Sequence, residues 1–212
     1  MNNSKIKDQI IEMASSLYHR GYSFGSSGNI SVKTETGFIM TPTGSSMADL
    51  KPSELSVLDS QGNLLSGHEP TKESFLHMAM YEQRSRAKAV VHLHCSHSSA
   101  VSCMHHGCTE NVLPPLTAYY VMRIGILPLI PYFAPGDINL AQAVKEKASK
   151  SHALLLANHG PVVAGTSLKD AVYATEELEE TAKLYLMLKN METQPLTPEA
   201  ISELNKKYPK KI

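Results

Sequence analysis

The sequence lacks most features that would place a protein in a specialised class. It contains no tryptophan and only three cysteines, and its 20 basic side chains balance its 20 acidic ones. Cys95, Cys103 and Cys108 are an odd number within a short stretch, so they do not indicate a disulfide framework. A net charge of zero gives no sign of a nucleic-acid partner or of binding to an anionic membrane.

Long apolar segments are also missing. The longest apolar runs, residues 124–130 and 154–157, are far shorter than the roughly 20 residues that cross a bilayer. Residues 1–9 are polar and carry charges of both signs, without the apolar core of a signal peptide. These absences predict a cytoplasmic protein without a membrane partner.

The composition is that of an ordinary globular protein. Of the 212 residues, 42% are apolar and 19% are charged, which is enough apolar surface to build a buried core. No repeat or linker interrupts the chain, so we predict one domain over residues 1–212.

The spacing of apolar residues predicts a mixed α/β fold. Helical spacing occurs over residues 5–19, 72–82, 138–150 and 167–189, and a further helix is expected to begin near Ser96 or Ser98. Strands are expected at 30–32, 38–40, 55–58, 64–65, 89–94, 127–132, 151–157 and 162–164. This order predicts one α/β domain with hairpins on one side and helices on the other.

Two histidines two residues apart give the sharpest chemical signal. In His92-Leu93-His94 both imidazoles project from the same face of the expected strand, while Leu93 points to the opposite face. Two neighbouring imidazoles make a partial site for a metal such as zinc. Two unrelated edge histidines would show the same pattern, so the site needs a third ligand.

Three residues compete for that third position. His97 is close in sequence but lies where the strand becomes a helix, and Cys95 points away from His94 on a strand. His159 ends the buried strand 151–157 and precedes a Gly-Pro turn that would fix its position. Spacing alone favours His159 only slightly over His97.

Glu73 opens a helix, where a carboxylate either compensates the helix dipole or takes part in a site. Thr71 and Lys72 add a hydroxyl and a cation beside the free N–H groups of the helix start, which suits a phosphate. The turns at 26–29 and 41–46 combine glycine with hydroxyl groups and could also cradle phosphate oxygens, although most such turns are only turns.

Taken together, five segments resemble the class II aldolase/adducin family. Their order and approximate spacing match that family over nearly the whole chain: residues 28–32, 41–44, 70–73, 90–94 and 158–160. The resemblance implies an α/β/α sandwich around a central, mostly antiparallel sheet. It also implies a homotetramer with active sites at subunit interfaces.

The resemblance also implies a role for each matching residue. His92, His94 and His159 would bind one Zn²⁺ per subunit, with other divalent metals possible. Glu73 would be the catalytic acid/base and a fourth ligand in the empty site. Five residues would surround the substrate phosphate: Asn29, Thr43, Gly44, Thr71 and Lys72.

Within the family, two segments point to a particular reaction. Residues 66–73, with Lys72 where sugar-phosphate aldolases carry serine, and residues 115–125 resemble most the 3-oxo-tetronate 4-phosphate decarboxylases. The implied reaction is zinc-dependent decarboxylation of a phosphorylated four-carbon keto acid to dihydroxyacetone phosphate and CO2, in four-carbon acid-sugar catabolism. Tyr119 would then donate a proton to the product, and Arg123 would hold the substrate carboxylate.

Two other functions stay open at this point. One is an aldolase or 4-epimerase of the fuculose-phosphate or ribulose-phosphate type. The other is a non-catalytic, adducin-like binding module, which the complete set of His92, His94, His159 and Glu73 disfavours.

Overall fold

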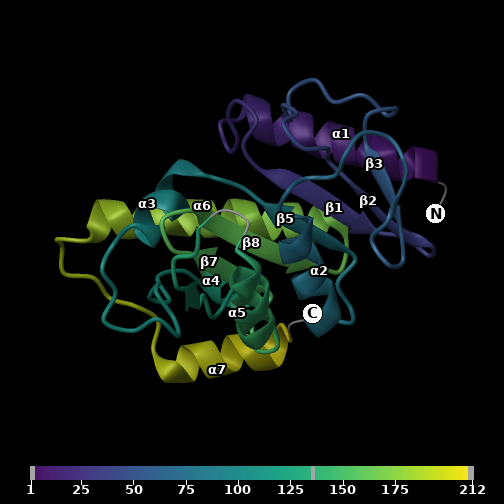
Figure 1. The fold of residues 1–212 in the computed structure, drawn as a ribbon. Coiled ribbons are helices and arrows are strands. Elements are labelled where there is room, and N and C mark those ends of the chain that lie inside the picture. Colours follow the sequence, from purple (N-terminus) through teal and green to yellow (C-terminus); the bar gives the residue numbers. More distant parts are fainter. Residues whose placement is uncertain (1–2, 135–136, 210–212) are drawn as a thin grey trace.

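The computed structural model describes residues 3–134 and 137–209, which form one eight-stranded sheet with helices packed on it (Figure 1). The strand order is β4-β3-β2-β1-β5-β8-β7-β6. In chain order the strands are β1 (Asn29–Lys33), β2 (Gly37–Met40), β3 (Ser56–Asp59), β4 (Leu64–Ser66), β5 (Ala89–His92), β6 (Leu129–Ile130), β7 (Ala153–Leu156) and β8 (Gly160–Gly165). The helices are α1 (Asn3–His19), α2 (Ser74–Gln83), α3 (Ser96–Ser102), α4 (Ala118–Arg123), α5 (Ile138–Ala148), α6 (Leu168–Leu188) and α7 (Pro198–Lys207).

The sheet is mostly antiparallel, as predicted. Among the strands of the described residues, only β6 and β7 pair in parallel, and all the other neighbouring strands run in opposite directions. In the register of the centre, His92 of β5 lies opposite Asn29 of β1 on one side and Val162 of β8 on the other. Three segments that are distant in sequence therefore meet at one end of these strands.

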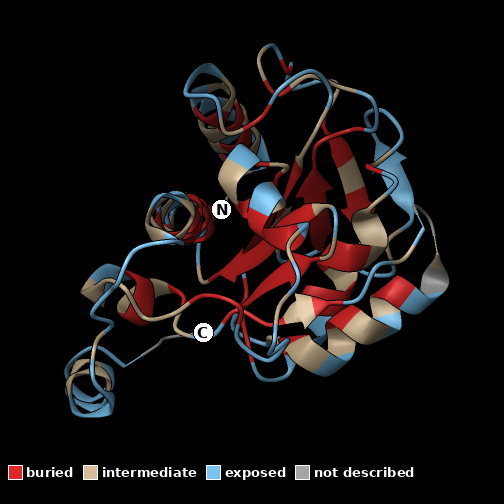
Figure 2. Cartoon of the chain, turned by 90° about the vertical axis from the view of Figure 1, so that its left-hand side faces the viewer, coloured by how far each residue is buried: buried red, intermediate tan, exposed pale blue. Residues whose placement is uncertain are grey.

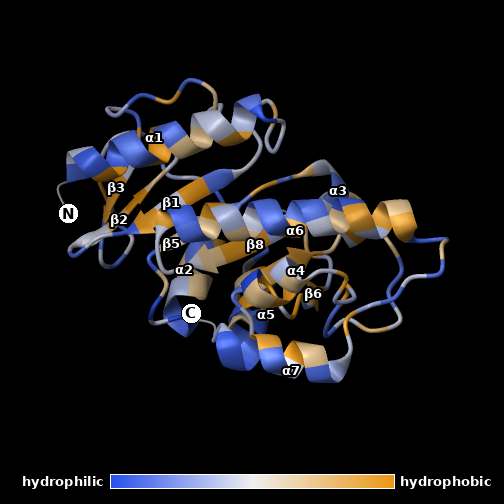
Figure 3. Cartoon of the chain, turned by 180° about the vertical axis from the view of Figure 1, so that it is seen from behind, coloured by the Kyte–Doolittle hydropathy of each residue, from blue (hydrophilic) through white to orange (hydrophobic). Residues whose placement is uncertain are grey.

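Helices cover both faces of the sheet. Seen from behind, α1 and α6 lie in front of it (Figure 3), whereas α2 and α5 lie on the face turned toward the viewer in Figure 1. The expectation of hairpins on one side and helices on the other is thus wrong in this respect. The physical reason is that β5, β7 and β8 are buried on both faces (Figure 2), so each face needs a helical layer.

The core is divided by the sheet. On the α2 and α5 face, Val90, Leu154 and Val162 pack against helix residues such as Leu76 and Val144. On the opposite face, the alternate strand residues pack against α1, α3, α4 and α6. Leu93 belongs to the apolar core on this opposite face. The alternation across β5 explains why His92 faces α2 while Leu93 faces away.

Some predicted boundaries were wrong. The strand expected at 89–94 ends at His92, and the one expected at 127–132 is only Leu129–Ile130. Helices α4 and α7 were not predicted, because α4 has only six residues and α7 has no buried residue. A six-residue helix is too short to show an apolar period, and α7 has only two large apolar residues, Ile201 and Leu204, in a polar segment.

No helix within the described ranges is both long and apolar enough to cross a bilayer. The prediction of one domain over residues 1–212 includes residues 1–2, 135–136 and 210–212, which lie outside the described residues, and it stays a prediction.

Candidate active site

Four potential metal ligands converge at one end of the central strands. His92 ends β5, His94 follows it, and His159 lies in the turn between β7 and β8. Glu73 precedes the first turn of α2, where its side chain makes no capping hydrogen bond. The structure therefore turns Glu73 toward the three histidines, not toward the helix start, and their ligand atoms all lie within 4.8 Å of one another.

The spacing of these atoms fits a single bound ion. The Nε2 atom of His92 lies 3.3 Å from those of His94 and His159, and the latter two are 2.9 Å apart. Glu73 Oε2 is 3.3 Å from His92 Nε2, and Oε1 is 3.2 Å from His159 Nε2. Atoms bound to zinc at 2.0–2.1 Å in a tetrahedron lie about 3.3 Å apart, so this donor set suits a divalent ion.

The site's electrostatics hold two of the four ligands, His94 and Glu73, in the protonation state that binds a metal. Burial and the nearby charges of His92 and His159 lower the pKa of His94 to about 4, so its imidazole is neutral at pH 7. Burial raises the pKa of Glu73, but the charge of His92 and hydrogen bonds from His159, His92 and Asn29 outweigh it and hold that pKa well below its ordinary range. A neutral imidazole and an ionised carboxylate are the forms that bind a metal.

Backbone contacts fix the orientation of two of the histidines. His92 Nδ1 donates to the Pro161 carbonyl at 2.8 Å, so Nε2 is the ring atom that faces the cluster and would bind a metal after losing its proton. His159 is held by α3: Ser99 Oγ donates to its carbonyl at 2.7 Å, and its own N–H donates to Ser102 Oγ at 3.1 Å. The preceding Asn158 has a positive φ of 56°, a conformation that asparagine tolerates better than most residues.

Glycine allows the two histidine-bearing segments to approach closely. A Cβ at Gly160 would lie 2.3 Å from the Leu93 carbonyl oxygen and 3.4 Å from His94 Cα. Any larger residue at position 160 must push the turn that carries His159 away from the segment that carries His92 and His94.

The two rival ligands lie outside the cluster. His97 Nδ1 lies 2.7 Å from Glu179 Oε1, and Glu179 also accepts from the Ser98 hydroxyl at 2.7 Å. Cys95 is buried in the core on the α1 side, where its thiol faces the Tyr22 carbonyl. The predicted direction of Cys95, away from His94, is confirmed.

The predicted phosphate-binding segments lie next to one another. The Thr71 N–H donates to the Thr41 carbonyl, and the Thr43 N–H donates to the Glu69 carbonyl, which ties the turn at 41–46 to the start of α2. A cavity of about 290 Å³ is lined by Thr43 and Gly44 among others. Lys72 is exposed, whereas Thr71 is buried and its hydroxyl accepts from the Glu73 N–H.

Asn29 is placed differently from a simple phosphate ligand. It lies opposite His92, is only 5% exposed, and donates through Nδ2 to Glu73 Oε2 at 2.8 Å. Its Oδ1 faces His77 Nε2 at 2.5 Å. The sequence prediction missed His77, although its position four residues after Glu73 places both on one side of α2.

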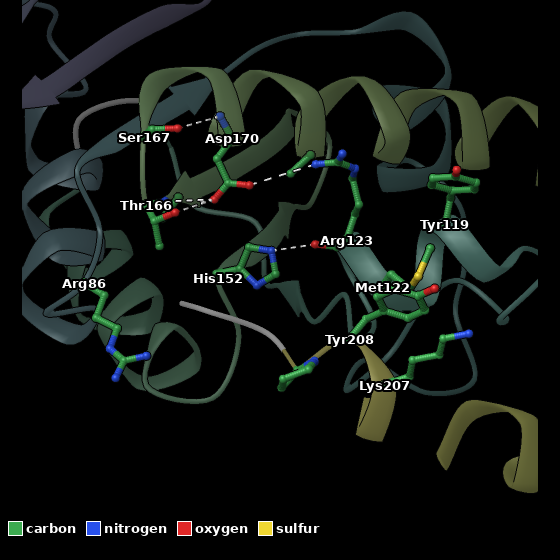
Figure 4. Close-up of a pocket in the computed structure, with 13 residues that line it drawn as sticks. Arg86, Tyr119, Met122, Arg123, His152, Thr166, Ser167, Asp170, Lys207 and Tyr208 are labelled. Carbon is green, nitrogen blue, oxygen red and sulfur yellow. Dashed lines mark hydrogen bonds and ion pairs between the residues drawn. The ribbon is translucent and has the colours of Figure 1, made fainter. Parts of the chain in front are cut away.

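Tyr119 and Arg123 lie elsewhere, in a cavity of about 920 Å³ that none of the four clustered residues lines (Figure 4). Thr166, which also lines this cavity, follows the last residue of β8, whereas Gly160 at the start of β8 is next to His159. At roughly 3.3 Å per residue, Thr166 and Gly160 are about 20 Å apart along the strand direction. Tyr119 is 62% exposed, and Arg123 pairs with Asp170 at 4.0 Å. Within one chain, these two residues are not brought to the histidine cluster.

The fold and the cluster together define an α/β protein with a metal-binding group of three histidines and one glutamate. Residues 8–186 match the model of the class II aldolase and adducin N-terminal domain, and the chain belongs to this family. It is 46% identical over 200 residues to a 3-oxo-tetronate 4-phosphate decarboxylase of Escherichia coli (strain K12), covering 94% of each chain.

Two further proteins are similar to this chain over most of its length. An L-fuculose phosphate aldolase of Methanocaldococcus jannaschii is 34% identical, with 85% of this chain and 96% of the relative covered. The solved structure of YgbL, a putative aldolase/epimerase/decarboxylase from Escherichia coli, superposes with a TM-score of 0.93 at 44% identity, covering 96% and 99% of the two chains. The fold resemblance implied by the sequence motifs is confirmed.

Proposed function

We propose that this chain is a zinc-dependent decarboxylase that converts 3-oxo-tetronate 4-phosphate to dihydroxyacetone phosphate and CO2. The observation that carries the proposal is 46% identity, over 94% of both chains, to a protein of that activity. The cluster of His92, His94, His159 and Glu73 supports it, because loss of CO2 next to a ketone needs stabilisation of negative charge.

The reaction breaks the bond between C1 and C2 of the substrate. Its electron pair moves toward the 3-oxo group, so that CO2 leaves and an enediolate remains. A divalent ion held by the cluster supplies a Lewis acid that stabilises this negative charge. Glu73, hydrogen-bonded to Asn29, accepts and returns protons at the substrate oxygens.

A proton must then reach C2 to complete dihydroxyacetone phosphate. We assign this step to Tyr119 and the grip on the substrate carboxylate to Arg123. Because both line a cavity apart from the cluster of their own chain, we propose that they act on the site of a neighbouring subunit. This arrangement accords with the homotetramer that we also propose.

The substrate phosphate is assigned to the joined turns around Thr43, Gly44 and Thr71, with Lys72 adding a positive charge. Hydrogen bonds between these turns support the assignment, because they hold several polar groups together directly before Glu73 in the chain. We further propose that the enzyme acts in the cytoplasm.

The decisive experiment offers the purified protein each enantiomer of 3-oxo-tetronate 4-phosphate and measures CO2 and dihydroxyacetone phosphate. One enantiomer should yield the two products in equal amounts. Chelation should abolish the activity, and Zn²⁺ should restore it. If neither enantiomer releases CO2 from the metal-loaded protein, the proposed reaction is wrong.

A sugar-phosphate aldolase is the second candidate, favoured by the 34% identity to an L-fuculose phosphate aldolase. An aldolase would release an aldehyde together with dihydroxyacetone phosphate and no CO2, and an epimerase would give an isomer without cleavage. The same product analysis, run with L-fuculose 1-phosphate, separates these activities. A protein that binds metal but converts none of these substrates would fit an adducin-like binding module.

A further inference from the structure

A row of polar side chains is buried behind Glu73, on the face of the sheet that α2 covers. His77 and Ser31 are fully buried and Tyr81 is 4% exposed. Their neighbours on this face are apolar, among them Phe38, Met40 and Val90. Polar groups in such surroundings are costly unless each is hydrogen-bonded.

The row arises from matching periods in a helix and a strand. Glu73, His77 and Tyr81 follow one another at four-residue steps along α2, each about 6.0 Å apart. Asn29 and Ser31 are two residues apart on β1, about 6.6 Å. The two rows therefore run side by side, and the helix side chains alternate with the strand side chains.

Hydrogen bonds connect all five side chains. Asn29 donates to Glu73 at 2.8 Å and faces His77 Nε2 at 2.5 Å through Oδ1. His77 Nδ1 lies 2.7 Å from Ser31 Oγ, and Ser31 Oγ lies 2.8 Å from the Tyr81 hydroxyl. Within the described ranges, no buried side-chain nitrogen or oxygen lacks a partner.

The direction of every bond follows from the carboxylate at one end. An ionised Glu73 can only accept, so Asn29 must turn its NH2 group toward it and its Oδ1 toward His77. The Nε2 atom of His77 must then carry hydrogen. Burial, with the charge of His92 nearby, lowers the pKa of His77 to about 3, so its Nδ1 is unprotonated and accepts from Ser31.

Because the Ser31 hydroxyl donates its hydrogen bond to His77, its oxygen accepts a hydrogen bond from the Tyr81 hydroxyl. All donors in the row thus point toward Glu73. This arrangement fixes one of the two possible orientations of the Asn29 amide, since the reverse orientation would set two acceptors against each other.

We propose that His77, Ser31 and Tyr81 are positioning residues that lock the Asn29 amide and, through it, the Glu73 carboxylate for metal binding and proton transfer. This proposal rests on the proposed function only where kcat for CO2 release is used to test it. Its prediction for metal binding holds whatever the substrate. Similar supporting contacts around metal ligands typically change affinity or activity by about 10- to 100-fold when removed.

The test measures Co²⁺ affinity by competition with a chelator, the Co²⁺ absorption bands, and kcat for CO2 release. His77→Leu removes the donor to Asn29 and should weaken Co²⁺ binding and lower kcat by about 10- to 100-fold. Ser31→Ala removes only a hydroxyl farther from Glu73 and should have a smaller effect in the same direction. Tyr81→Phe should have the smallest effect.

Two matched variants separate positioning from packing. His77→Gln keeps an amide donor and an acceptor at the same position and should recover most of what His77→Leu loses. Tyr120→Phe removes the hydroxyl of another buried tyrosine, which contacts Asn111 and not the row, and should leave Co²⁺ affinity unchanged.

Unchanged Co²⁺ affinity and kcat in both Ser31→Ala and His77→Leu would overturn the proposal. An equal loss in His77→Leu and His77→Gln would also overturn it, because packing alone would then explain the effect. If His77→Leu does not fold, the Co²⁺ affinity and kcat of Ser31→Ala and Tyr81→Phe test the proposal instead. A protein without decarboxylase activity whose Co²⁺ affinity still follows this order would support the row while refuting the proposed function.

Discussion

The histidine cluster and the cavity of Tyr119 and Arg123 represent two kinds of functional surface. The cluster is complete within one chain, with four donors from three segments that converge on a point and are held by hydrogen bonds. The cavity has a volume of about 920 Å³, and Tyr119 at its wall is mostly exposed. The difference indicates that metal binding needs one chain, whereas the proposed full reaction needs two.

The largest effect should come from breaking the cluster. His94→Ala removes one of three imidazoles, so the variant should lose its bound metal and fall to background activity. Elemental analysis of the purified protein and a CO2 assay check this result. Normal turnover in a metal-free His94→Ala protein would show that the cluster is not the catalytic centre.

Next in size is Glu73→Gln, which keeps the shape of the side chain but removes its charge and basicity. Loss of a general acid/base lowers turnover by about 10²- to 10⁴-fold, and we expect kcat for CO2 release to fall within that range. His92, His94 and His159 remain, so the variant should still bind metal, although more weakly. An unaffected kcat would reduce Glu73 to a structural role.

The comparison can be tested directly by mixing the subunits of two impaired variants. Tyr119→Phe alone should slow product protonation, and His94→Ala alone should be inactive. In the proposed homotetramer, randomly mixed at 1:1, about a quarter of the sites would combine an intact cluster with a neighbour's Tyr119, and activity should return accordingly. Unfolding and refolding the mixture before the CO2 assay allows exchange, and each variant refolded alone is the control. No gain over the two variants refolded separately would place Tyr119 outside the neighbour's site.

Gly160→Ala tests how tightly the cluster depends on backbone packing. The added Cβ would meet the Leu93 carbonyl oxygen at 2.3 Å, and we expect about 1–3 kcal/mol of destabilisation with weaker metal binding. Chemical denaturation and a Zn²⁺ competition titration measure the two effects. Gly107→Ala is the matched control, because a Cβ there meets nothing within 4 Å. Equal stability of the two variants would contradict the close approach.

The smallest effect concerns Arg123. Its replacement by glutamine should raise KM for the acid substrate by about tenfold, the weight of one charge-assisted contact, with kcat less affected. Steady-state kinetics with the metal-loaded enzyme measure both constants. If KM does not change, the pair of Arg123 with Asp170 is structural, as its 4.0 Å separation within one chain would allow.

Much of the fold could be predicted from local pattern. The helices over 5–19 and 167–189 and the antiparallel return of 162–164 onto the preceding strand correspond to α1, α6 and the β7–β8 pair. Local pattern could not reveal α4, which is too short, or the helical layers on both faces, which depend on how strands assemble. It likewise overextended the strand at 89–94, because alternation continues past the last paired residue, His92.

The sequence by itself determined that His92 and His94 lie on one face and Leu93 on the other, since the strand period requires it. It could not choose between His97 and His159 without a family resemblance. The tertiary structure gives the physical reason for that choice, because the β7–β8 turn brings His159 to the histidines at the end of β5 while Glu179 holds His97 aside. It also revealed the row behind Glu73, because hydrogen bonds between a helix and a strand more than forty residues apart depend on packing and not on sequence spacing.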